Sequence, residues 1–74
     1  MIYTIEQLKQ IAKTGGGLTL DASTLTFIQL RDITTAANSG KAKITVKNLS
    51  GLTSLQLGEL SALAPGLIVF DLTN

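Results

Sequence analysis

The chain has 74 residues, which allows one domain with one small hydrophobic core. It contains no Cys and no His, and this composition excludes disulfides, thiol and histidine catalysis and nearly all zinc sites. The net charge of +1 and the scattered cations give no indication of nucleic-acid binding, and no apolar run is long enough to span a membrane.

A domain of this size is close to the limit at which a hydrophobic core alone stabilises a fold. Because disulfides and metal sites are excluded, we expect a second chain to contribute, either a protein partner or another copy in a homo-oligomer. The N-terminus lacks a basic region followed by an apolar run, so we expect no secretion signal and a cytoplasmic location.

The pattern Thr-x-x-Gln-Leu occurs three times, at residues 4–8, 26–30 and 53–57. Threonine is a favourable N-cap, and a glutamine three residues later completes a capping box. An apolar residue before each threonine can pack against the leucine as a hydrophobic staple, and these residues are Tyr3, Leu25 and Leu52. Three such signals in register predict three helix starts.

Apolar residues at helical spacing follow each cap. They are Ile5, Leu8, Ile11 and Ala12 in the first helix, Phe27, Leu30, Ile33 and Ala37 in the second, and Leu55, Leu57, Leu60, Leu63 and Ala64 in the third. The helices are expected to stop at Gly15-Gly16-Gly17, at Asn38-Ser39-Gly40 and at Pro65-Gly66. Gly58 lies inside the third helix, where we expect the close approach of a neighbouring helix to explain it.

Short segments with strand-like patterns accompany the helices at residues 1–3, 18–20, 43–47 and 67–70. The resulting order βαβαβαβ predicts an α/β fold with a parallel sheet and right-handed crossovers, in which all helices cover one face. We interpret residues 1–74 as a single domain of three tandem helix–strand repeats, at about 3–24, 25–51 and 52–74, arranged like a short solenoid.

The repeated leucine-containing helix, glycine stop and two-hydrophobe strand resemble the leucine-rich-repeat class in their logic, without its consensus asparagine ladder. The pattern is more similar to helix–strand repeats of small bacterial proteins, and this resemblance covers nearly the whole chain. The resemblance implies the fold and carries no activity.

Alternation along the strands separates two faces of the predicted sheet. If one set points to the helices (Leu18, Leu20, Ile44, Val46, Ile68 and Phe70), the opposite face is either solvated or binds a partner. The last strand is an apolar edge open to pairing, and its register stays open because Leu67 and Val69 could point inward instead. The candidate partner-binding residues are Thr19, Asp21, Thr45, Lys47, Leu67, Val69 and Asp71.

No residue pattern indicates catalysis, a cofactor, a metal site or a small-molecule substrate. The acidic residues lie on different units, and Lys47 separates Asp21 from Asp71, which argues against a catalytic pair of carboxylates. Gly15-Gly16-Gly17 follows a helix and precedes a strand, which is the reverse of a phosphate-binding loop. We therefore expect a non-enzymatic module that binds protein or assembles with itself.

Two alternatives stay open. Residues 18–37 resemble the core of STAS domains, the anti-sigma-factor-antagonist fold, in which a strand ending in Asp leads through a Thr-Phe-Ile-like segment into a helix. That resemblance implies a regulatory switch, but Phe27-Ile28-Gln29-Leu30 lacks the family's Asp and phosphorylatable Ser, so phosphotransfer to Ser23 or Thr26 would be needed to support it. The second alternative is a structural unit that stacks into a longer solenoid, since no polar cap is evident at the C-terminal end.

Overall fold

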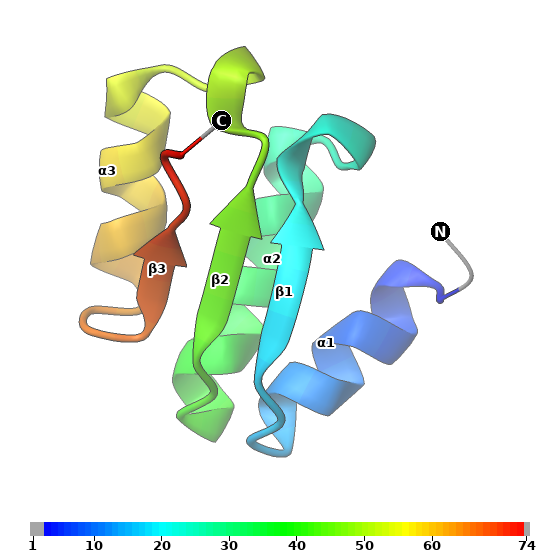
Figure 1. The fold of residues 1–74 in the computed structure, drawn as a ribbon. Helices are drawn as coiled ribbons and strands as arrows, with labels where there is room; N and C mark the ends of the chain where they lie inside the picture. The colour runs from blue at the N-terminus through cyan, green and yellow to red at the C-terminus, as the bar shows by residue number, and fades with distance from the viewer. Residues whose placement is uncertain (1–2, 74) are drawn as a thin grey trace.

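The computed structural model describes residues 3–73, which form one layer of helices on one parallel sheet (Figure 1). The helices are α1 (Ile5–Lys13), α2 (Phe27–Gly40) and α3 (Ser54–Leu63), and the strands are β1 (Leu18–Asp21), β2 (Ile44–Lys47) and β3 (Ile68–Phe70). Two 3-10 turns, η1 (Ala22–Thr24) and η2 (Leu49–Gly51), follow β1 and β2. This arrangement confirms the predicted α/β class. The strand predicted at residues 1–3 falls on two residues outside the described part, and Tyr3 lies in a bend.

The same capping box opens all three helices. The hydroxyls of Thr4, Thr26 and Thr53 each accept a hydrogen bond at 3.1 Å from the backbone N–H of the glutamine three residues later. In return, each glutamine side-chain oxygen accepts from the threonine N–H at distances between 2.8 and 3.0 Å. Two N–H groups that a helix start leaves without a partner are thus satisfied each time, and the predicted helix starts are confirmed.

The first helix ends as its glycines predict. Gly15 adopts a left-handed conformation with φ of 96°, its N–H donates to Ala12 O, and the N–H of Gly16 donates to Ile11 O, which is a Schellman motif. At the end of α2 the left-handed residue is Lys41, with φ of 58°, while Gly40 stays within the helix. The prediction that Gly40 stops α2 is therefore wrong by one residue.

Gly40 is needed for helix packing instead. A Cβ atom at this position would lie 2.2 Å from the carbonyl oxygen of Ala12 and 2.4 Å from that of Lys13. Because glycine has no Cβ, the C-terminal turns of α1 and α2 approach each other backbone to backbone. The left-handed conformation then falls on Lys41, which adopts it less readily than glycine.

Gly58 has no comparable role. A Cβ atom there would meet nothing within 4 Å, so the predicted close approach of a neighbouring helix at Gly58 is wrong. The residue is exposed on α3, where a glycine costs about 1 kcal/mol of helix stability relative to alanine.

The three strands pair in the order β1-β2-β3, and both pairs are parallel. The inward-facing residues lie side by side in two rows and pack with the helices, namely Leu18, Ile44 and Ile68 in one row and Leu20, Val46 and Phe70 in the next. Val69, which alternates with Ile68 and Phe70, is exposed. The register that the sequence left open is therefore the one in which Ile68 and Phe70 point inward.

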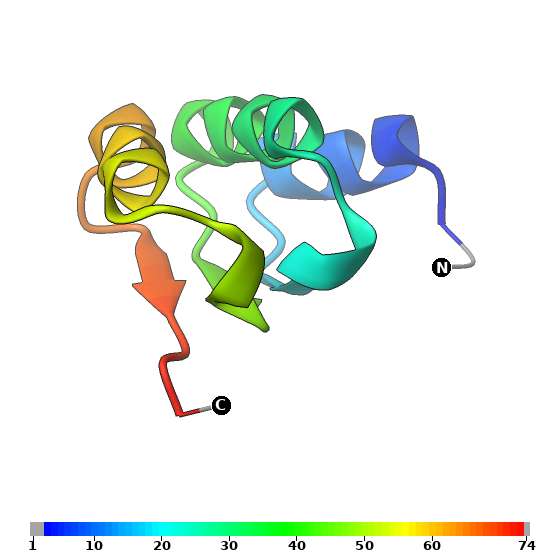
Figure 2. The ribbon, with the colours of Figure 1, turned by 90° about the horizontal axis from the view of Figure 1, so that it is seen from above.

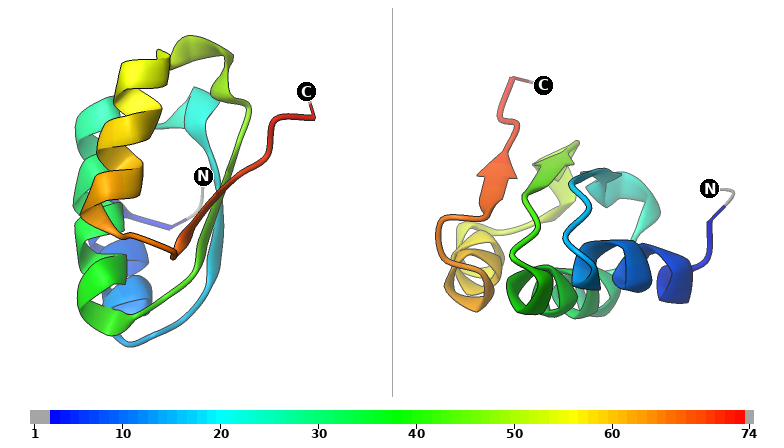
Figure 3. Two further views of the ribbon diagram at one scale, coloured as in Figure 1. Left: turned by 90° about the vertical axis from the view of Figure 1, so that its left-hand side faces the viewer. Right: turned by 90° about the horizontal axis from the view of Figure 1, so that it is seen from below.

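All three helices lie on the same side of the sheet (Figure 2), and within the described chain no helix or strand covers the other side (Figure 3). The core is centred on α2 and β2, whose Leu30, Ile33 and Val46 are completely buried. Two predicted core positions are wrong, because Ile11 is 37% and Leu55 is 76% exposed. Both lie on the outer helices α1 and α3, which have a helical neighbour on one flank only in this part of the chain.

One polar side chain is buried among the apolar residues of α2. The Thr34 hydroxyl has no hydrogen-bond partner within residues 3–73, and Thr34 is almost completely buried. An unsatisfied buried hydroxyl costs about 1–3 kcal/mol.

Alanine substitutions at Gly40 and Gly58 are expected to change stability in opposite directions. Gly40→Ala should lower the free energy of unfolding by about 1–3 kcal/mol, because its Cβ meets two carbonyl oxygens. Gly58→Ala should raise it by up to about 1 kcal/mol, because helix propensity improves in open space. Urea unfolding of both variants and the wild-type chain measures these changes. A Gly40→Ala variant as stable as wild type would contradict the contact between α1 and α2.

Candidate functional site

The uncovered face of the sheet carries the residues that alternate with the inward-facing ones. Strand register places Thr19, Thr45 and Val69 in one row across the three strands, and Asp21 beside Lys47 in the next row. Asp71 continues this second row, since it directly follows β3 and its N–H donates to Val46 O at 2.8 Å. Six of the seven predicted partner-binding residues are thus on one surface.

Leu67, the seventh predicted residue, lies at the start of the edge strand. It directly precedes β3, its side chain is half-buried, and its carbonyl oxygen accepts a hydrogen bond from Ile44 N at 2.8 Å. Its backbone therefore belongs to the β2–β3 ladder.

Asp21 and Asp71 make the same local turn at the ends of their strands. Oδ1 of Asp21 accepts hydrogen bonds from the Ser23 N–H at 2.9 Å and from the Ser23 hydroxyl at 2.6 Å. Oδ1 of Asp71 accepts from the N–H and the hydroxyl of Thr73. These Asx turns hold both carboxylates at the C-terminal edge of the sheet.

The same hydrogen bonds favour the ionised carboxylates. The Ser23 hydroxyl, then the Asn48 side chain and the Ser23 N–H, lower the pKa of Asp21 below its ordinary value of 3.8. The hydroxyl and then the N–H of Thr73 lower the pKa of Asp71 in the same way. The positive charge of Lys47 adds a smaller lowering to each of these pKa values.

Lys47 acts on the two aspartates through its field and not through a direct ion pair. Among residues 3–73 the ion pair within 4.0 Å is Lys9 with Glu6, and Lys47 forms none with Asp21 or Asp71. The row of alternating charge, Asp21, Lys47 and Asp71, is therefore an open, solvated feature that an incoming chain can complete.

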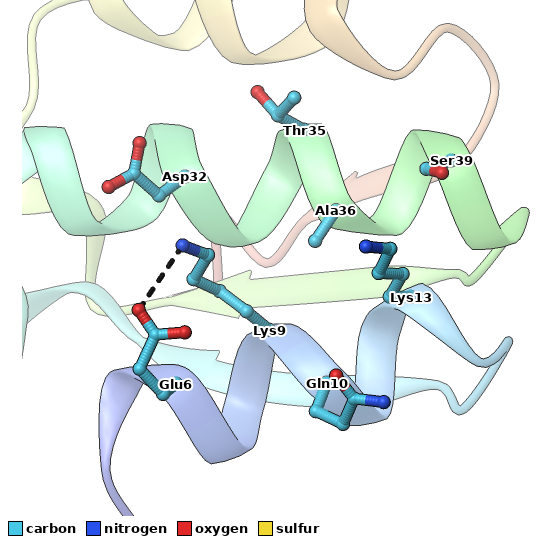
Figure 4. Close-up of a pocket in the computed structure, with 8 residues that line it drawn as sticks. All are labelled: Glu6, Lys9, Gln10, Lys13, Asp32, Thr35, Ala36 and Ser39. Atoms are coloured by element: carbon cyan, nitrogen blue, oxygen red, sulfur yellow. Dashed lines mark hydrogen bonds and ion pairs between the residues drawn. The ribbon is translucent and has the colours of Figure 1, made fainter.

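A polar groove lies between α1 and α2 on the outer side of the helix layer (Figure 4). Lys9 and Lys13 extend from α1 towards α2, and Glu6 pairs with Lys9 at 3.5 Å. The groove has a volume of about 430 Å³, and its lining residues are Glu6, Lys9, Gln10, Lys13, Asp32, Thr35, Ala36 and Ser39. Acidic and basic side chains are mixed and open to water, which is typical of a solvated surface.

The two most exposed large apolar side chains on the described helices were not predicted from the sequence to belong to a site. Ile28 is 64% exposed on α2 and Leu55 is exposed on α3. Each is the second helical residue after its cap threonine, the place that Glu6 occupies in α1. Because the charged Glu6 occupies this position in α1, the sequence could have indicated that the same position faces outward in α2 and α3.

The two hydroxyls that a STAS-like switch would use are engaged in local structure. The Ser23 hydroxyl donates to Asp21, and the Thr26 hydroxyl accepts from the Gln29 N–H. Both residues thus have a structural role in the connection from β1 to α2.

Other kinds of site find no support in the described part of the chain. No three Asp or Glu side chains there come close enough to hold a metal ion, and no helix there is long and apolar enough to cross a membrane. Comparisons with protein-family models, with curated proteins and with solved structures find no match. The geometry of the chain itself is therefore the basis for a functional proposal.

Stability is expected to fall in acid because of Asp21 and Asp71. Their pKa values in the folded chain lie below 3.8, so the ionised carboxylates stabilise the fold above that pH, and this contribution is lost as the pH falls through the lowered pKa values. The double variant Asp21→Asn, Asp71→Asn should therefore lose less stability than wild type between about pH 5 and pH 2. Urea midpoints across this range measure the difference, and equal slopes for the two chains would contradict the role of the carboxylates.

Proposed function

We propose that the chain is a small non-enzymatic protein-binding module, built from three helix–strand repeats as a short solenoid. Its docking surface is the uncovered sheet face that ends at β3. The same capping box at Thr4, Thr26 and Thr53 supports the repeat. The proposed occupant is a protein chain, and the proposal includes no cofactor and no small-molecule substrate.

The observation that carries this proposal is that the helices cover one face of the sheet (Figure 3). Parallel sheets normally have both faces covered. The outward row across the three strands, Thr19, Thr45 and Val69, is open or partly open to solvent. Another chain can cover two threonines and a valine without burying a charge, which keeps the desolvation cost low.

The edge strand β3 extends this surface. Ile68 and Phe70 on β3 are partly exposed, whereas Ile44 and Val46, at the same register on β2, are completely buried. The difference arises because β2 has a neighbouring strand on both sides, whereas β3 has a neighbour on one side only within residues 3–73. Leu72, which is 72% exposed, adds apolar area at the same edge.

A second copy of the chain can cover this edge by antiparallel pairing of two β3 strands about a twofold axis at Val69. Ile68 would then lie beside Phe70 of the second copy, and Asp71 beside Leu67, so no like charges meet. End-to-end stacking of β3 on β1 would instead bring Asp71 next to Asp21. A closed dimer is therefore favoured over a filament in this proposal.

Sedimentation velocity over a range from about 10 µM to about 1 mM tests the self-association. The wild-type chain is expected to shift from monomer to dimer without larger species. Val69→Lys should keep it monomeric, because two lysines would meet at the twofold axis.

Thr35→Lys is the matched control, because it adds the same charge on the outer side of the helices. This variant should dimerise like wild type. A wild-type chain that stays monomeric at about 1 mM would contradict self-association at β3, and growth into open-ended species would contradict the closed dimer.

A further inference from the structure

A groove lies along the outer edge of β1, beneath α1. Its apolar wall is formed by Tyr3, Leu8, Leu20 and Leu25, and its volume is about 500 Å³, within the range of about 300–1,000 Å³ that ligand pockets span. α1 extends beyond β1 on this side of the molecule (Figures 2 and 3). The helix therefore roofs a space beside the sheet that no strand of residues 3–73 fills.

The edge of β1 in this groove offers unpaired backbone groups. The N–H of Leu18 donates to the carbonyl oxygen of Lys43, which faces β1 from the β2 side. Alternation along the strand then directs the N–H of Thr19 to the free edge. The polar part of the groove lining consists of Thr19, Asp21, Thr24 and Lys47, and Lys47 belongs to β2 on the far side of β1 from the free edge. Apolar side chains next to the donors and acceptors of an edge strand are what strand addition requires.

The other edge of β1 shows which kind of strand it accepts. There β2 pairs in parallel, with Ile44 and Val46 beside Leu18 and Leu20 and with Lys47 beside Asp21. Both apolar residues of β2 are completely buried in that position. A strand of the same chemistry in the groove would place its own cation on the second side of Asp21, and so extend the row of alternating charge.

The described chain does not supply this strand itself. Two strands of the sheet lead to a helix. β1 ends at Asp21, five residues before the cap Thr26 of α2, and β2 ends at Lys47, six residues before the cap Thr53 of α3. A strand at the same spacing before Thr4 falls outside residues 3–73.

A second copy of the chain fits the groove poorly. Its edge strand β1, with the sequence Leu-Thr-Leu-Asp, has no cation to place beside Asp21. Its other edge strand, β3, would bring Asp71 beside Asp21 in the parallel register of the sheet, at the spacing of neighbouring strands, about 4.8 Å. Both carboxylates have lowered pKa values and stay charged near neutral pH. Its β2 is the central strand and has both edges occupied.

We propose that the free edge of β1 binds an extended basic segment of a different polypeptide, in parallel, in the groove beneath α1. The segment has two β-branched apolar residues, separated by one residue, directly followed by a lysine or arginine. The apolar pair packs with Leu8 and Leu20 under the helix, and the cation lies beside Asp21. This site shares no apolar residue with the β3 edge, so it stands or falls independently of the self-association proposed above.

The probe is a terminally blocked peptide with the sequence of residues 42–49, titrated into the isotope-labelled full chain. We expect saturable shifts of the Thr19, Leu20 and Asp21 amide signals and a change in the fluorescence of Tyr3, the single tyrosine. A peptide with Asp in place of the lysine that corresponds to Lys47 should bind about tenfold more weakly, because a repulsive pair replaces an attractive one. This difference should shrink at about 0.5 M salt.

Asp21→Asn is the informative variant, because asparagine keeps an acceptor for Ser23 while it removes the charge. It should reduce the discrimination between the two peptides from about tenfold to below about threefold. Asp32→Asn, which changes the net charge equally on α2, should leave the discrimination unchanged.

Three outcomes of the peptide titration would overturn the proposal. They are the absence of saturable shifts, equal binding of the two peptides, and shifts centred on β3 instead of β1. Shifts of the β1 amides that grow with protein concentration in the absence of peptide would show that a second copy occupies the groove, and would also overturn it. Dimerisation at β3, measured separately with Val69→Lys, is unaffected by any of these results.

Discussion

The structure depends on one constraint, which is that all three helices lie on the same side of three parallel strands. Short right-handed crossovers between neighbouring strands place consecutive helices on one side. The middle strand β2 then has a neighbour on each edge and helices above it, and its Ile44 and Val46 are completely buried. Within residues 3–73, one face and two edges of the same small sheet are left uncovered, and each proposal about binding follows from these surfaces.

The charged row on the open face distinguishes between the ways in which these surfaces can be covered. Asp21 and Asp71 end the two outer strands, and Lys47 ends the strand between them. Both edges are therefore acidic at the same register, which disfavours end-to-end stacking of identical chains. The same row favours a cation on any strand that pairs with β1, while twofold pairing of β3 avoids the conflict because Asp71 then lies beside Leu67. The charges of Asp21, Lys47 and Asp71 thus favour self-association at the edge of β3 and binding of a different, basic chain at the edge of β1.

Interactions between residues close in sequence could be predicted from the sequence, whereas contacts between helices and strands far apart in the sequence could not. Thr26 and Gln29 are three residues apart, so their capping box needs no other part of the chain. Strand alternation likewise predicts which residues form the bare face, since one residue in two must point away from the helices. Gly40 and Gly58, by contrast, differ only in what lies next to them, and the carbonyl oxygen of Ala12 beside Gly40 becomes visible only when α1 and α2 are packed. The groove along β1 could not be predicted for the same reason, because it exists only where α1 extends beyond the sheet.

Residue-resolved amide hydrogen exchange at low protein concentration tests most directly whether both outer strands have a free edge. Strong protection is expected for the N–H groups of Thr45, Val46 and Val69, which point to neighbouring strands within the sheet. Much faster exchange is expected for Thr19, Ile68 and Phe70, whose N–H groups point to the free edges. Protection of Ile68 and Phe70 as strong as that of Val46 in a monomeric sample would show that β3 is already covered and has no free edge.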